Sequence, residues 1–161
     1  MTQTELIQIF MGFLGTFGFS ILFNIRGKRL AMAAFGGFLS WALFVLLGNV
    51  IESEPVRYFL VSGAISLYAE IMARMFKTPT TTVLMTALIP LVPGASLYYT
   101  MAYALENDLE KFLSKAVYTL QLAGALALGI VITTMVVRSF NTVKKENRYG
   151  KCETIYSNQT K

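Results

Sequence analysis

The chain of 161 residues contains no histidine and only one cysteine, Cys152, which lies close to the C-terminus. A chain with a single cysteine cannot form an internal disulfide bond. The absence of histidine also excludes metal sites and catalytic pairs that need histidine together with cysteine or serine. The one aspartate, Asp108, lies in a polar connection between apolar segments. We therefore predict that the protein is not an enzyme and that it holds no metal and no cofactor.

Charge is also scarce, because charged residues make up 14% of the chain, against about 25% in an ordinary soluble domain. Hydrophobic residues make up 55%, and the mean hydropathy is +0.55. Five apolar segments are each about 20 residues or longer, which is enough to cross ~30 Å of hydrocarbon as a helix. They cover residues 5–23, 30–50, 56–76, 80–105 and 112–137. The sequence therefore predicts an all-α fold, a polytopic helical bundle of five transmembrane helices in a lipid bilayer.

The basic residues are distributed unevenly over the connections between these segments. The connection after the first segment, the one after the third and the C-terminal tail together hold 11 of the 14 lysines and arginines. Positive charge favours the cytoplasmic side, so we expect the N-terminus outside and the C-terminus in the cytoplasm. Residues 1–143 would form the transmembrane domain, and residues 144–161 a polar, basic cytoplasmic tail. The net charge of +5 is then explained by basic residues on the cytoplasmic side, and we expect no nucleic-acid partner.

The fourth segment contains the sequence IPLVPG, residues 89–94, within an uncharged apolar run. Each proline removes a backbone donor and disfavours helical geometry in the residue before it. We expect a broken helix, with a second half-helix that starts at Pro93 and lies near the middle of the membrane. The amides of Gly94, Ala95 and Ser96 would then be free to bind a carboxylate. The alternative is that Pro90 and Pro93 only kink the helix and bind no ligand.

Three more polar residues are candidates for contact with a substrate. Tyr98 and Tyr99 follow the break, where a hydroxyl in the membrane needs a partner, although tyrosines often only anchor a helix at the membrane interface. Gln121 lies midway along the fifth segment. Its alternative role is a hydrogen bond between helices.

A charged pair lies within the third apolar segment. Glu70 and Arg74 are four residues apart, so they share one helix face. An acid inside the membrane often faces a watery path and can carry a proton. Alternatively, Arg74 reaches the cytoplasmic interface and neutralises Glu70 as a structural ion pair. The sequence leaves both roles open.

Three stretches of the sequence resemble a known transporter family. They read FGFSILFNIRGKRL, YAEIMARMFKTPTTTV and IPLVPGASLYYTM. Together they are similar to the threonine/serine exporter family, and more closely to its C-terminal-type half, which also occurs as a separate short subunit. The resemblance extends over residues 17–137.

The resemblance implies export of small hydrophilic metabolites, such as threonine, serine or succinate, driven by the proton gradient. It implies a second membrane subunit of the N-terminal type and a place in the cytoplasmic membrane of a bacterium. The resemblance does not decide whether the chain also forms homo-oligomers. The alternative function is a membrane subunit that assembles or regulates a complex without transporting a substrate.

Overall fold

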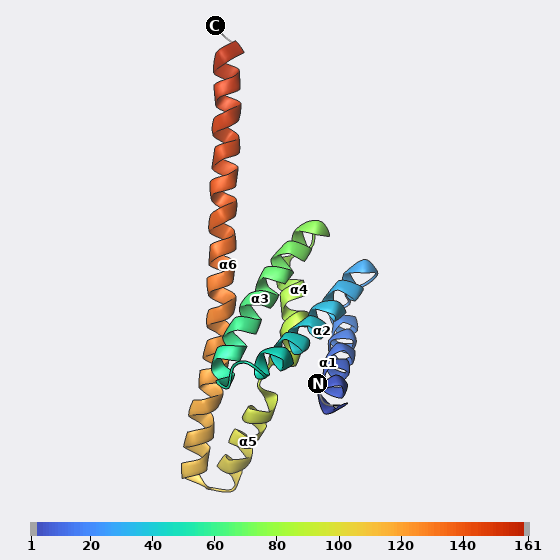
Figure 1. Ribbon diagram of the computed structural model, residues 1–161, viewed down its shortest axis with the longest axis vertical. Helices are drawn as coiled ribbons and strands as arrows, with labels where there is room; N and C mark the ends of the chain where they lie inside the picture. The colour runs from blue at the N-terminus through green and yellow to red at the C-terminus, as the bar shows by residue number, and fades with distance from the viewer. Residues whose placement is uncertain (1–2, 160–161) are drawn as a thin grey trace.

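The computed structural model of the protein describes the backbone of residues 3–159 and the side chains of residue 3 and residues 7–139. Every regular element in this part of the chain is a helix, which confirms the predicted all-α class. The elements are α1 (Gln3–Leu22), α2 (Lys28–Gly48), α3 (Glu54–Met75), α4 (Thr80–Leu88), the short 3-10 helix η1 (Ile89–Leu91), α5 (Gly94–Leu105) and α6 (Leu109–Gln159) (Figure 1).

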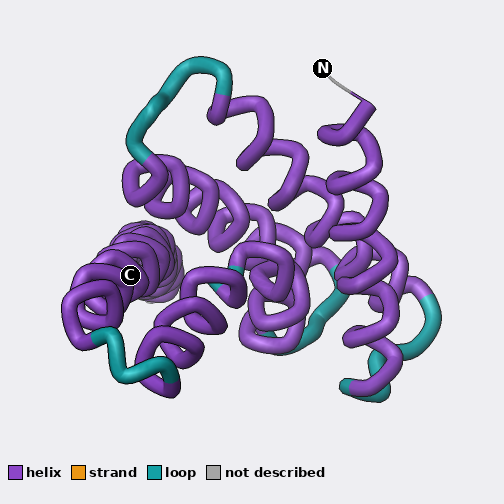
Figure 2. The backbone as a smooth tube through the Cα atoms, turned by 90° about the horizontal axis from the view of Figure 1, so that it is seen from below, coloured by secondary structure: helices purple, strands orange, loops and turns teal. Residues whose placement is uncertain are grey.

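Four helices pack as an antiparallel group beside the long helix α6. Helix α2 contacts α1, α3 and α4, and α3 packs along α6. Helix α5 turns away from α4 and packs along the first turns of α6 (Figure 1). Seen from below, α6 is viewed along its length beside the shorter helices (Figure 2). The described part of the chain thus places the α4–α5 break between the helical group and α6.

Three helical stretches are long and apolar enough to cross a membrane, namely Lys28–Gly48, Glu54–Met75 and Leu109–Ser139. The pair Thr80–Leu91 and Gly94–Leu105 meets the same test jointly, but it is bent by 59°. The apolar part of α1, Ile7–Leu22, is shorter. Length and composition therefore support three spans, or four if the bent pair is one span. The fifth span and the orientation remain predictions.

Glycine residues allow two pairs of helices to approach closely. A Cβ atom on Gly37 of α2 would collide with the Thr16 side chain of α1. A Cβ atom on Gly129 of α6 would lie 2.5 Å from the carbonyl oxygen of Phe59 in α3. In a membrane the hydrophobic effect does not drive helices together, because lipid tails are as apolar as the side chains. Small residues let the helices approach closely and pack against one another. Helices α1 and α2, and α3 and α6, therefore form the two tightest contacts of the bundle.

The apolar core lies where α3, the α4–η1 segment and α6 meet. Val61, Ile65, Leu91 and Leu122 are all nearly or fully buried there. Leu91 belongs to η1 and is buried in this core, so the core holds the broken segment in place. This anchoring holds the residues that follow Leu91 at a defined position against α3 and α6.

Helix α6 continues to Gln159, past the predicted boundary between residues 143 and 144. The side chains of the predicted tail lie outside the described residues, as do residues 160 and 161. The division into a membrane domain and a tail therefore remains a prediction.

Candidate functional site

The break between α4 and α5 is centred on Val92 and Pro93. Ile89 keeps helical geometry (φ −50, ψ −46) although it precedes Pro90. Val92 is extended (φ −61, ψ 125), as expected for a residue before proline. Helix α4 ends at Leu88, just before Pro90, and the chain continues as η1 to Leu91. Only the Val92–Pro93 step leaves helical geometry altogether. Pro90 is accommodated in η1, where its missing N–H costs little because few intrahelical bonds are available there.

The amide of Gly94 is not free, which differs from the expectation. It donates a 2.7 Å hydrogen bond to the carbonyl oxygen of Val92, and Pro93 has the dihedral angles of an inverse γ-turn (φ −74, ψ 57). Ala95 and Ser96 follow in the first turn of α5, where amides have no carbonyl partner within the helix. No side chain caps this helix end. The donors that remain are therefore the amides of Ala95 and Ser96, with the Ser96 hydroxyl beside them.

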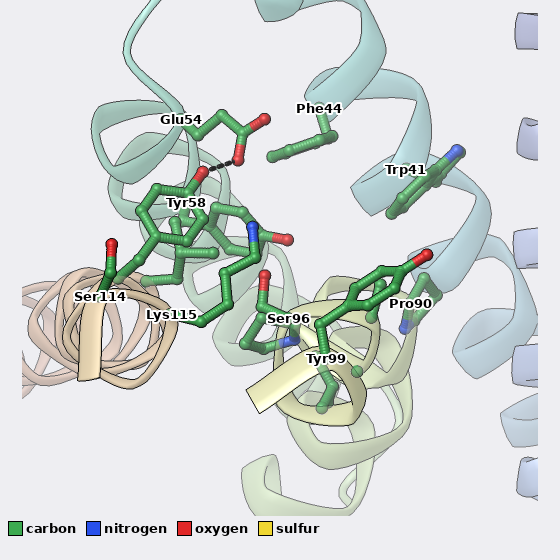
Figure 3. A pocket seen from close by; sticks show the side chains of 15 residues that line it. Trp41, Phe44, Glu54, Tyr58, Pro90, Ser96, Tyr99, Ser114 and Lys115 are labelled. Atoms are coloured by element: carbon green, nitrogen blue, oxygen red, sulfur yellow. Dashed lines mark hydrogen bonds between the residues drawn. The ribbon is translucent and has the colours of Figure 1, made fainter. Parts of the chain in front are cut away.

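A cavity of about 750 Å³ lies where this break faces α2, α3 and α6 (Figure 3). We call it the central cavity. Its lining from the broken segment is Pro90, Val92, Pro93, Gly94, Ala95, Ser96 and Tyr99. The other helices contribute Trp41, Phe44, Glu54, Tyr58, Ser114, Lys115, Tyr118 and Leu122.

The central cavity lies towards the end of the bundle where α3 and α6 begin. Glu54 is the first residue of α3, and Lys115 lies in the second turn of α6. The break is level with the first turns of α3, since Leu88, Leu91, Tyr58 and Val61 belong to one buried cluster. Its place near the middle of the membrane remains a prediction.

Two side chains of opposite charge line the central cavity. The Glu54 carboxylate accepts a hydrogen bond from the Tyr118 hydroxyl. The Lys115 ammonium lies 5.2 Å from the centre of the Tyr118 ring. Among the described side chains, no carboxylate forms an ion pair with Lys115. Figure 3 shows the ammonium pointing into the cavity, with Ser96 on one side and Glu54 on the other.

This arrangement can bind a small anion. A lysine ammonium and the first amides of a helix both stabilise negative charge, and here they come from different helices and face one cavity. Glu54 supplies a negative group across the cavity from Ser96 (Figure 3). A ligand with a carboxylate at one end and a positive group at the other would satisfy both.

The structure brings six of the predicted substrate-binding residues into the cavity lining: Pro90, Pro93, Gly94, Ala95, Ser96 and Tyr99. Tyr98 does not line it. Its side chain is 70% exposed and packs edge-on against Tyr99, with ring centres 5.6 Å apart. Gln121 lies on the exposed face of α6, also away from the lining.

The predicted charged pair is formed, but it lies elsewhere. Arg74 donates to the Glu70 carboxylate at 3.2 Å, with the Glu70 side chain only 13% exposed. Both residues belong to the last turns of α3, whereas the central cavity lies beside its first turns. Neither residue lines the central cavity.

Sequence reasoning missed Glu54, Lys115 and Tyr118. In the charge count, Lys115 was only one of the three basic residues not assigned to the cytoplasmic side. A usable signal was present, however, because Lys115 lies inside the apolar segment of residues 112–137, where a charge is costly and usually functional. Glu54 gives no such signal, since it precedes a proline at a helix start, where acids are common.

Comparison with known protein families gives one result that bears on this site. A family model described as threonine/serine exporter, ThrE, matches residues 8–136. The matched region includes every residue that lines the central cavity. Comparison with curated proteins and with solved structures gave no match.

Proposed function

Because the chain belongs to the threonine/serine exporter family, we propose that it is a membrane subunit of a secondary exporter for small carboxylate-bearing metabolites. The central cavity would hold the cargo. The observation that carries this proposal is the Lys115 ammonium, which lines the cavity without an ion-pair partner among the described residues. It stands beside the first turn of α5, where the amides of Ala95 and Ser96 have no helical carbonyl to bind.

The position of Glu54 bears on the choice of cargo. A carboxylate held by Lys115 and Ser96 would leave the rest of the cargo near the Glu54 carboxylate (Figure 3). The ammonium of threonine or serine would be attracted there, whereas the second carboxylate of succinate would be repelled. The cavity therefore favours the amino acids over dicarboxylates as cargo.

We further propose a five-span topology with the N-terminus outside. Helix α1 would be the first span, and the bent α4–α5 pair the fourth. In support, the basic connection after α1 and the one after α3 lie at the same end of the bundle (Figure 1). Positive connections favour the cytoplasm, so the central cavity would open towards the outside. The membrane would be the cytoplasmic membrane of a bacterium.

Proton coupling needs a carboxylate that faces the path of the cargo. Glu54 lines the central cavity, and its ion pair with Arg57 is long, at 3.7 Å, whereas Glu70 pairs with Arg74 at 3.2 Å and lies outside the cavity. We therefore assign the coupling proton to Glu54 and a structural role to the pair of Glu70 and Arg74. Efflux that continues unchanged after the pH gradient is collapsed would remove this part of the proposal.

A second subunit of the N-terminal type would complete the transporter. In support, α6 is the least buried of the three spans that pass the length and composition test. Gln121 is a polar residue on its exposed face. Because a polar side chain in the membrane gains from a partner helix, we place the second subunit against this face.

The competing function is a subunit that assembles or regulates a complex without transporting anything. Under that function, Pro90 and Pro93 would tolerate replacement by alanine, and only residues at helix contacts such as Gly129 would matter. Export measured with both subunits, together with their co-purification, separates the two functions. Loss of export with intact co-purification favours the exporter.

The Gly94→Phe variant should reduce export about five- to tenfold while the protein still inserts and folds. No atom lies within 4 Å of a Cβ placed on Gly94, so the ring can be accommodated, but it would enter the central cavity. Efflux of labelled threonine from proteoliposomes that contain both subunits measures the effect. Gly18→Phe on α1 is the matched control, since the position around Gly18 is equally open and lies outside the cavity. Normal export by Gly94→Phe would contradict the proposed site.

A further inference from the structure

A second, smaller cavity of about 250 Å³ lies beside the central one. Residues of α1, α2 and α3 line it, among them Gln8, Gly48 and Arg57. Trp41 and Phe44 line both cavities, so their rings form the wall between them. We call this space the outer cavity, because it lies at the same end of the bundle as Glu54.

Two buried N–H donors in the lining of the outer cavity have no partner. The indole nitrogen of Trp41 and the Nε atom of Arg57 are inaccessible to solvent and make no hydrogen bond among the described residues. In Figure 3 the Trp41 nitrogen points away from Ser96 and Lys115. Buried donors are nearly always satisfied, and an unsatisfied one is costly. Both residues line the outer cavity, so a small shift of either side chain would let its donor bind a ligand there.

The charge of Arg57 identifies the class of ligand. Its side chain is 16% exposed, and its guanidinium lies 5.0 Å from the centre of the Phe44 ring. Among the described side chains, Glu54 is its ion-pair partner, at 3.7 Å, which is too far for a hydrogen bond. Glu54 also accepts a hydrogen bond from Tyr118. The donors of the guanidinium fork are therefore left for another acceptor, and this fork matches a carboxylate or a phosphate.

We propose that the outer cavity is a second binding site, specific for a small carboxylate, with Arg57 and the Trp41 indole as donors. Its volume is below the roughly 300–1,000 Å³ of pockets that hold drug-sized ligands, so it suits a small anion. The identity of the carboxylate rests on the proposed function. In the exporter it is the cargo, bound on the outer side of the Trp41 wall after it leaves the central cavity.

Trp41 provides the readout, because it is the only tryptophan in the chain. The purified full chain, in a nonionic detergent without phospholipid, is titrated with threonine and with succinate while Trp41 fluorescence is recorded. The titration uses Lys115→Gln protein, which lacks the cation of the central cavity. We expect one of the two carboxylates still to change the fluorescence. Adding Arg57→Gln should weaken its binding at least about tenfold, because a charged hydrogen-bond donor is lost.

Gly48→Ala tests the site without changing any charge. A Cβ atom on Gly48 would lie 2.9 Å from an Arg57 guanidinium nitrogen, so it should displace the fork and weaken binding. If the Arg57→Gln protein does not fold, carboxylate binding by the Gly48→Ala variant tests the outer cavity in its place. Unchanged binding in both variants would overturn the proposal. A response to short-chain phosphatidylglycerol, with none to either carboxylate, would also overturn it, since the site would then hold a lipid phosphate.

The proposals for the central cavity and for the outer cavity can be contradicted independently of each other. If Lys115→Gln alone leaves export intact, the central site is wrong, whatever the fluorescence shows. If Lys115→Gln stops export but Arg57→Gln leaves the fluorescence titration unchanged, the central site stands and the outer site does not.

Discussion

Export by the Lys115→Gln variant is expected to fall by roughly 10- to 100-fold. Lys115 is the cation in the lining of the central cavity, and it has no ion-pair partner among the described residues. Hydrogen bonds to charged groups contribute about 1.5–3 kcal/mol, which corresponds to that range. Glutamine keeps a hydrogen-bond donor of similar length but removes the charge. Efflux of labelled threonine from proteoliposomes with both subunits measures the change.

Lys111→Gln is the matched control, one helical turn earlier on α6. Lys111 is 64% exposed and forms a 2.7 Å ion pair with Asp108, outside the central cavity. Its side-chain hydrogen bond holds the pKa of Asp108 below the ordinary value. Export by Lys111→Gln should be close to that of the unaltered protein. Equal losses in the two variants would mean that the positive charge acts through the surface rather than through the cavity.

The Gly129→Leu variant is expected to lose its folded state. A Cβ atom at this position would lie 2.5 Å from the Phe59 carbonyl oxygen and closer still to the Ser62 hydroxyl. One of the clashing atoms belongs to the backbone of α3, which cannot change its position as a side chain can by rotating. Overpacking usually costs 1–3 kcal/mol, so a clash with α3 backbone should cost more than about 3 kcal/mol. Helices α3 and α6 would separate, and the core around Leu122 would open.

Gly124→Leu tests whether this loss depends on position. It lies on the same helix, with no atom within 4 Å of its Cβ position. Its stability should stay within about 0.5 kcal/mol of that of the original protein. Thermal unfolding in detergent, followed by the amount of monodisperse protein, compares the two variants. A stable Gly129→Leu protein would show that the α3–α6 contact is wrong.

Local features of this site could be read from the sequence because their causes are local. Proline acts on its own residue and on the one before it, so a break near IPLVPG was predictable. Its exact place was not. The α-helix ends before Pro90, but Ile89 keeps helical angles within η1, and the chain becomes extended only at Val92. Leu91, which lies between the two prolines, is buried in the core, and that long-range contact could not be read from the two prolines.

The opposite wall of the cavity could not be predicted in the same way. Glu54 and Lys115 are separated from the break by long stretches of chain, and they meet it only after α3 and α6 have packed together. Likewise, Gln121 and Leu122 are neighbours in sequence, but one is exposed and the other is buried. An apolar helix in a membrane carries little periodic signal to tell these faces apart, since lipid and core are both apolar.

The central claim is that cargo binds beside the first turn of α5 in a cavity open to the outside. Chemical labelling of a Ser96→Cys variant tests it most directly, in a Cys152→Ser background that removes the only native thiol. A membrane-impermeant maleimide is added to the outside of intact cells that contain both subunits. We predict that the introduced thiol reacts and that threonine or serine slows the reaction severalfold. A thiol that reacts equally fast with and without any cargo, or only from the cytoplasmic side, would contradict this account.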